Sequence, residues 1–458
     1  MGGEWYYLSD YTFIPYTTDC RGCNESQEKH GIQRDSGHTS PEDASLDAVA
    51  TIISLGSGRQ QVAVARNPEV HSLELLIASE KSLSPSHSDI TTSFNHLREL
   101  SSVARSFDQA AETQAKLIAH VYRMCRSEFD KIVRSYTAAL EDRLNKLKNV
   151  TELKRPGSQE DTGRDVVWVG FCAVKTIVEY AHSLDSDEPT EDLILLLHKT
   201  LTPVDLILQS MDETMLLDSA VGAFAIRWSS YLPSYSRLMI LVDGGVSRAL
   251  RDICVLSRAV AVLMDSVLDN QRIATLLAEG LKCEFLERSQ YSDTSITLND
   301  DVSAALVCHF PALNRISSQE LLDRIHTKLS EYPTDSIRAD AVNKATFHVR
   351  VSVHCEMALI SRLISCNTES TLYIACALPV CYACHVFVKA FKTIEGNNSI
   401  HVRWFDGTLD CGWDLPPFLA TSDIKESIMK KWNLTVQAAV DGYQERARYV
   451  STYISRVV

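Results

Sequence analysis

Two short motifs with an apolar run between them limit most strongly what this chain can fold into. The first, at residues 353–360, is VHCEMALI, in which a histidine and a glutamate stand two positions apart after a β-prone stretch. The second, at 379–384, is PVCYAC, a Cys-x-x-Cys pair close behind a proline, and proline is favoured in the first turn of a helix. The run between them, TLYIACA, has the composition of a buried strand. The motifs therefore predict two helix starts that flank one strand.

These motif residues have the ligand chemistry that zinc requires. A zinc site with an open position uses three protein ligands and leaves room for water. His354, Cys381 and Cys384 supply one nitrogen and two thiolates, and the start of a helix favours thiolate over thiol. Glu356 converges on the same point only if His354 lies at the start of its helix. It then need not be a ligand, and it can hold water and carry protons as a general acid and base.

Two other interpretations of the same residues remain open. In the first, His354 caps a helix, while Cys381 and Cys384 are core thiols that behave as small hydrophobic residues. In the second, the zinc is purely structural. The run 371–391 is also apolar for nearly the thickness of a membrane, but Pro379 lies in it and its first part is β-prone. The sequence therefore predicts a strand, a turn and a buried helix here, and no membrane span.

The rest of the chain divides into four parts by its apolar periodicity. Residues 1–42 are polar, without a sustained apolar period, and predict a disordered or weakly ordered tail. Residues 43–82 predict most of a helix, which Ser40 and Pro41 can start, and two strands. Residues 83–338 repeat apolar positions at three- and four-residue spacing and predict an all-α helical insertion. Residues 339–458 hold both motifs and the C-terminal helices.

The motifs and the order of elements resemble the cytidine deaminase superfamily. A His-x-Glu motif followed by Pro-Cys-x-x-Cys is the signature of zinc deaminases. More narrowly, the chain resembles the deaminase-like proteins of fungi that are related to bacterial toxin deaminases, over roughly 41–80 and 345–420. It departs from the superfamily at Val380, which stands where a proline usually precedes the first cysteine.

The resemblance implies a three-layer α/β/α domain of the α/β class, interrupted here by the helical insertion. It also implies Zn²⁺ as cofactor, held by His354, Cys381 and Cys384, with Glu356 as the catalytic proton carrier. The reaction would be hydrolytic deamination of a nucleobase, free or in a nucleoside, nucleotide or nucleic acid, with release of ammonia. The resemblance does not choose among these substrates.

Four further residues are candidates for contact with the substrate. Ser79 and Glu80 end the second predicted strand, at the active-site end of a deaminase fold. Trp404 and Trp413 follow a predicted strand and have rings that can stack on a base, although aromatic residues in such places are more often part of the core.

Net charge and cysteine content limit which binding partners and which cellular location are expected. The formal net charge of −14 does not support general attraction to nucleic acid, although from about residue 341 the charges nearly balance. The N-terminus lacks the features of a signal peptide, so the thirteen cysteines are expected to be reduced and the protein to be intracellular. The competing hypothesis is a non-catalytic protein with a deaminase fold, whose helical insertion binds a protein partner.

Overall fold

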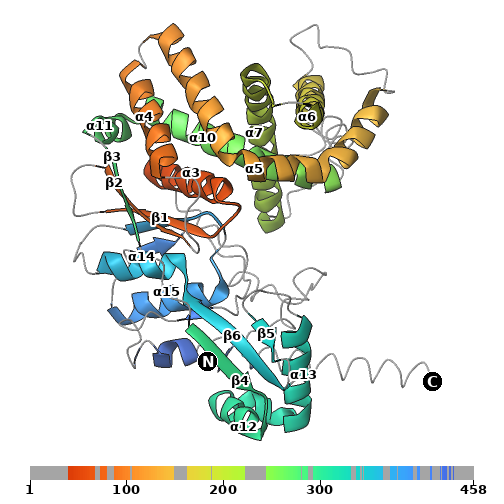
Figure 1. The fold of residues 1–458 in the computed structure, drawn as a ribbon, viewed down its shortest axis with the longest axis vertical. Helices are drawn as coiled ribbons and strands as arrows, with labels where there is room; N and C mark the ends of the chain where they lie inside the picture. Colours follow the sequence, from red (N-terminus) through yellow and green to blue (C-terminus); the bar gives the residue numbers. More distant parts are fainter. Residues whose placement is uncertain are drawn as a thin grey trace.

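A computed structural model gives the fold of the chain (Figure 1). The residues that it describes are 40–67, 73–79, 87–103, 106–148, 162–186, 188–221, 244–279, 281–286, 292–331, 337–340, 343, 345–364, 372–378, 380–395, 400–402, 413–414, 423, 425–430, 433–434 and 437. Residues 1–39 of the predicted tail at 1–42 and the turn before the second strand lie outside these residues.

A five-stranded mixed sheet lies at the centre of the fold, in the order β3-β2-β1-β7-β8. β1 (Val62–Arg66) is antiparallel to β2 (Leu73–Ser79) and to β7 (Leu372–Cys376). β3 (Leu281–Phe285) runs parallel to β2, and β8 (Ile400–Val402) runs parallel to β7. Strands from both ends of the chain therefore pair directly, as a domain with a long interruption requires.

Helices cover both faces of this sheet, which confirms an α/β architecture compatible with a deaminase-like fold. Residues alternate between the two faces of a strand, so Val62 and Val64 of β1 pack on one face and Ala63 and Ala65 on the other. The first face packs against α3 (Pro41–Gly56), and we call it the α3 face. The second face packs against α14 (Cys355–Ile364) and α15 (Tyr382–Glu395), and we call it the α14/α15 face (Figure 1).

The start of α3 follows from its first residues. The hydroxyl of Ser40 accepts a hydrogen bond from the backbone N–H of Asp43, and the Asp43 carboxylate accepts one from the backbone N–H of Ser40, both at 3.1 Å. This reciprocal cap satisfies N–H groups that the first turn of a helix leaves unpaired. The predicted start at Ser40 and Pro41 is confirmed, which is two residues before the predicted domain boundary.

The region predicted as an all-α insertion is helical only in part. Its helices that precede β3 share one hydrophobic core with the α3 face of the sheet. After them, however, the chain forms β3, then β4 (Ser292–Thr297) and β5 (Ile337–Ala339), so the prediction of an all-helical segment is wrong there. These strands are only three to six residues long. The alternation of apolar and polar residues that marks a strand is therefore too short to be recognised beside the long helical repeats. Between β2 and β3, the described residues form the helices α4 (His87–Val103), α5 (Phe107–Lys148), α6 (Thr162–Ser186), α7 (Glu191–Val221), α10 (Gly244–Asp269) and α11 (Gln271–Glu279).

A smaller sheet leads the chain to the first motif. β6 (Thr346–Val353) pairs antiparallel with β4 and with β5, and runs parallel to the short β9 (Trp413–Asp414). It ends directly before His354, so it fixes where the histidine leaves the sheet (Figure 1). Beside it lie α12 (Asp300–His309), the 3-10 helix η3 (Pro311–Arg315) and α13 (Ser318–Glu331).

The apolar run 371–391 does not form one long helix. It is divided between β7 and α15, as the sequence predicts. None of the helices in the described part of the chain has the length and apolar character needed to cross a membrane.

Candidate metal centre

His354 stands at the N-terminus of α14. It directly follows β6, and its backbone carbonyl accepts the hydrogen bond of the Ala358 N–H at 3.0 Å, which makes it the residue that caps the helix. The predicted position at a helix start is confirmed. Because the cap residue is not yet helical, its imidazole can turn toward the side chain of Glu356, which the regular spacing of a helix would hold apart.

Cys381 and Cys384 occupy the corresponding place at the start of α15. The Cys381 carbonyl accepts a hydrogen bond from the His385 N–H at 3.0 Å, so Cys381 is the cap residue of this helix. Its sulfur accepts a further hydrogen bond from the backbone N–H of Cys384 at 3.5 Å. The first turn therefore brings both sulfurs to one side, next to backbone donors that stabilise a thiolate.

The ligand atoms converge as they would around a single zinc ion. Nδ1 of His354 lies 3.6 Å from Sγ of Cys381 and 3.6 Å from Sγ of Cys384. A nitrogen and a sulfur bound to one zinc at about 2.1 and 2.3 Å, at a tetrahedral angle, are about 3.6 Å apart. One ligand atom of each of these residues and of Glu356 fall within 4.8 Å of one another. The donor set thus fits a tetrahedral zinc with three protein ligands.

Glu356 lies beside these ligands and is fully buried. One of its carboxylate oxygens is 3.8 Å from Nδ1 of His354. Among the described residues, none donates a hydrogen bond to either oxygen. A buried carboxylate without a donor is costly, so this position fits a carboxylate that faces a metal and its water. Burial raises the pKa of Glu356, but His354, with a smaller effect of Cys384, lowers it by more, so the net pKa lies below its usual value.

The two thiols differ in acidity when no metal is present. A hydrogen bond from the Cys384 thiol lowers the pKa of Cys381 to about 6, against the opposing effect of burial. Burial raises the pKa of Cys384.

Residues 353–417 match the model of a family described as OTT_1508-like deaminases, and all four clustered residues lie in the match. This segment is a deaminase-family domain. The family is related to the cytidine deaminase superfamily, which confirms the predicted resemblance. The narrower likeness to fungal proteins remains a prediction. The same comparisons find no match to the chain among curated proteins or among solved structures.

Of the four residues predicted to contact the substrate, the structure describes the side chain of Ser79. Ser79 pairs with Val62 at the end of β2, so its side chain belongs to the α3 face, whereas the candidate metal ligands lie at the starts of the helices on the other face. Glu80 and Trp404 lie outside the described residues, and of Trp413 only the backbone, in β9, is described. Their contacts with a substrate remain predictions. Val380, at the departure from the superfamily motif, is buried in the core of the α14/α15 face.

The structure also brings Gln61, which the sequence analysis did not single out, next to the first turn of α14. The Cys355 thiol donates a hydrogen bond to the Gln61 carbonyl at 3.3 Å, which ties the start of β1 to the first turn of α14. The side-chain carbonyl oxygen of Gln61 is buried, and among the described residues nothing donates a hydrogen bond to it. Gln61 belongs to no motif, so only the packing of β1 against α14 reveals it.

Proposed function

We propose that the protein is a zinc-dependent hydrolytic deaminase that acts on a nucleobase. The observation that carries this proposal is the convergence of His354, Cys381 and Cys384 at two helix starts inside a deaminase-family domain. Structural zinc sites are usually closed by four protein ligands. Here the nitrogen and the two sulfurs give three ligands, and the fourth member of the cluster is the buried carboxylate of Glu356. Three ligands leave the open position that hydrolysis needs.

His354, Cys381 and Cys384 would hold the zinc. Bound zinc supplies a Lewis acid that lowers the pKa of water and so provides a nucleophile at neutral pH. The protein contributes a preorganised donor set, because both helix starts are fixed by backbone hydrogen bonds before any metal binds.

Glu356 would carry the protons of the reaction. Water forms a C–O bond to the ring carbon that bears the exocyclic amine, the C–N bond breaks, and ammonia leaves. Glu356 accepts a proton from the attacking water and delivers it to the departing nitrogen, so the carboxylate is regenerated. Its burial excludes bulk water from this transfer, and because no described residue donates a hydrogen bond to its oxygens, both oxygens are available.

The substrate class is a nucleobase, free or carried by a nucleoside, nucleotide or nucleic acid. The net charge of −14 favours a small substrate over general attraction to a phosphate backbone. The proposal therefore places free bases and nucleosides first among the compounds to test.

The proposal is tested by ammonia release from the zinc-loaded full-length protein with cytosine and adenine bases, nucleosides, nucleotides and single-stranded oligonucleotides. Glu356→Gln should keep zinc but lower kcat by about 10²- to 10⁴-fold, the usual contribution of a positioned proton carrier. Cys384→Ser should lose zinc and activity together. Glu320→Gln, on the exposed side of α13, is the matched control and should change neither.

Zinc bound at the expected 1:1 ratio without ammonia from any of these substrates would contradict the proposal. It would favour instead the non-catalytic interaction protein, in which the helical region binds a partner. Equal ammonia release by the wild type and Glu356→Gln would also contradict it, because the reaction would then not depend on the carboxylate.

A further inference from the structure

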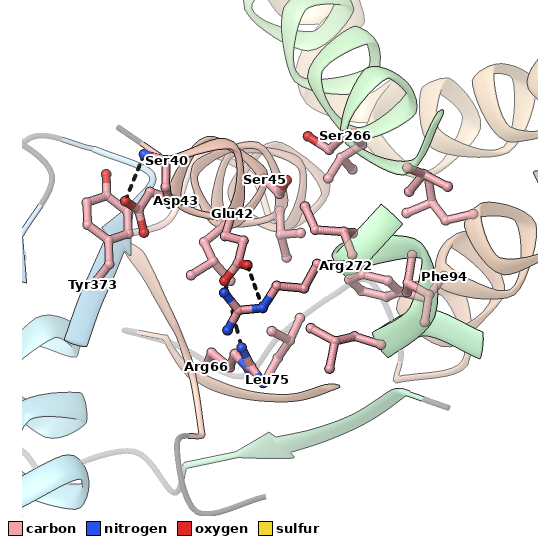
Figure 2. A pocket seen from close by; sticks show the side chains of 18 of the residues that line it. Ser40, Glu42, Asp43, Ser45, Arg66, Leu75, Phe94, Ser266, Arg272 and Tyr373 are labelled. Carbon is pink, nitrogen blue, oxygen red and sulfur yellow. Dashed lines mark hydrogen bonds and ion pairs between the residues drawn. The ribbon is translucent and has the colours of Figure 1, made fainter. Parts of the chain in front are cut away.

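A cavity of about 540 Å³ lies on the side of the sheet opposite to the metal centre. Residues of α3, α4, α10 and α11 line it, together with β1, β2 and the start of β7 (Figure 2). The metal ligands begin α14 and α15, which cover the other face of the same sheet. The cavity is therefore separate from the metal centre, and its role does not depend on the deaminase proposal.

Most of the cavity wall is apolar. Aliphatic and aromatic side chains from four helices form this wall, and each also belongs to the core on the α3 face. Cavities of a few hundred Å³ with apolar walls and a small number of polar groups are typical of sites for small molecules. The residues that form this wall are Val49, Phe94, Leu97, Val267, Ile273 and Leu277.

Two arginines and one glutamate form the polar end. Nε of Arg272 lies 3.1 Å from one carboxylate oxygen of Glu42, and a terminal nitrogen of Arg66 lies 3.7 Å from the other. Figure 2 shows the three side chains pointing toward one another, with Phe94 on the far side of the cavity. Two guanidinium groups carry ten N–H donors, more than one carboxylate can accept. Asp43, the other acidic group of the lining, is engaged in the cap of α3.

Arg66 has a donor that these contacts do not satisfy. Its Nε is shielded from solvent, and among the described residues none accepts a hydrogen bond from it. A buried donor without an acceptor costs free energy, and the cost is larger for a charged group. The polar end of the cavity thus has an unused guanidinium donor, which an anionic group would match.

We propose that this cavity binds a small amphiphilic carboxylate, with its carboxylate group at Arg66 and Arg272 and its apolar body against the wall around Phe94. Guanidinium groups bind carboxylates in a planar, paired geometry, which gives the head group its specificity. Burial of the body in the apolar wall gives most of the affinity.

The test uses the full-length protein and isothermal titration calorimetry at low salt with decanoate as the probe. Decyltrimethylammonium, which has the same chain and the opposite charge, is the matched ligand. Decanoate should bind at one site per chain, and the cation should not. Arg272→Gln should weaken decanoate binding about tenfold or more, because a charge-assisted contact is lost. Arg324→Gln on α13, which removes an arginine away from the cavity, should leave it unchanged.

A filled cavity gives an independent measurement. Ser45 is half-buried on α3 and lines the cavity, so Ser45→Phe places a ring in the space with little disturbance of the packed core. It should abolish binding of decanoate, while far-UV circular dichroism and zinc content stay as in the wild type. No saturable binding of decanoate, equal binding of the cation, or unchanged affinity in both Arg272→Gln and Ser45→Phe would each overturn the proposal.

Discussion

The chemistry of the metal centre depends on two residues that are each the cap of a helix. His354 and Cys381 each stand directly before the first residue of a helix. Their backbones are therefore not bound to the helical geometry, and their side chains can turn toward each other. A histidine or cysteine in mid-helix would be committed to one direction by the helical period. At the cap position, the Cys381 sulfur also accepts a hydrogen bond from the backbone N–H of Cys384.

Gln61 is expected to position the substrate of the proposed deaminase. Its buried side-chain carbonyl oxygen has no donor among the described residues, and its backbone is tied to α14 one residue before Glu356. An exocyclic amine or ring N–H of a substrate would supply the missing donor. Gln61→Ala should therefore lower kcat/KM about tenfold or more at unchanged zinc content, measured by ammonia release and by metal analysis.

Gln319→Ala, which removes an exposed carboxamide on α13, is the control for this substitution. A loss of zinc in Gln61→Ala would show instead that Gln61 only supports the fold around the metal. Unchanged kcat/KM at full zinc occupancy would remove it from the substrate site.

The motif residues could be predicted from the sequence because their chemistry is local. A histidine or a cysteine pair at a helix start has a recognisable spacing, and so His354, Glu356, Cys381 and Cys384 were found together. Gln61 is nearly three hundred positions from Cys355 along the chain. No local spacing relates them, so only the pairing of β1 with its neighbours could bring them together.

Among the helices and strands, α3 and β7 could also be predicted from local sequence, whereas β3 could not. α3 has a capping box and a helical apolar period, and β7 has a compact apolar run, so both were predicted within a residue or two. β3 has the sequence LKCEF and lies between a helix and a short strand. It is held in a strand conformation by its parallel pairing with β2. A strand stabilised by a distant neighbour leaves little trace in its own sequence.

The capping box should contribute measurably to the stability of α3. Ser40→Ala removes the acceptor of the Asp43 N–H and is expected to lower the free energy of unfolding by about 1 kcal/mol. Urea denaturation followed by circular dichroism measures this change. Ser102→Ala, in the last turn of α4, removes an exposed hydroxyl that caps no helix start, and it should change the free energy much less.

A Ser40→Ala variant as stable as the wild type would show that tertiary contacts alone hold the first turn of α3. The helix is well placed for such contacts, since its second half is buried against β1 and the helical region. The size of the loss therefore separates local capping from packing.

At the scale of the whole molecule, one sheet separates two hydrophobic cores. The core on the α3 face continues without a break into the helical region, and the core on the α14/α15 face includes Cys381 and Cys384 of the candidate metal centre. The helical region is therefore packed on the α3 face of the sheet, in contact with α3, and is not a separate body joined by a linker. We expect it to unfold together with the domain that carries the metal centre.

His198 gives this joint unfolding a dependence on pH. It is only 4% exposed, between α7 and α10, where Nδ1 lies 3.2 Å from the Ser257 hydroxyl and the ring meets Tyr122 edge-on. Burial lowers its pKa from the ordinary 6.5 to about 4. The unfolded chain then binds a proton that the folded chain does not, over the range between these two values. Stability is complete above pH 6.5 and is lost as the pH falls toward 4.

A difference of this size corresponds to about 3 kcal/mol at the acid end of the range. Urea denaturation at pH 7.5 and at pH 4.5 should show a larger loss of stability in the wild type than in His198→Gln, whose side chain does not titrate. The comparison within each protein cancels the cost of the substitution itself at neutral pH. Equal losses in the two proteins would mean that His198 takes up its proton in the folded state, and that the core between α7 and α10 is open to water.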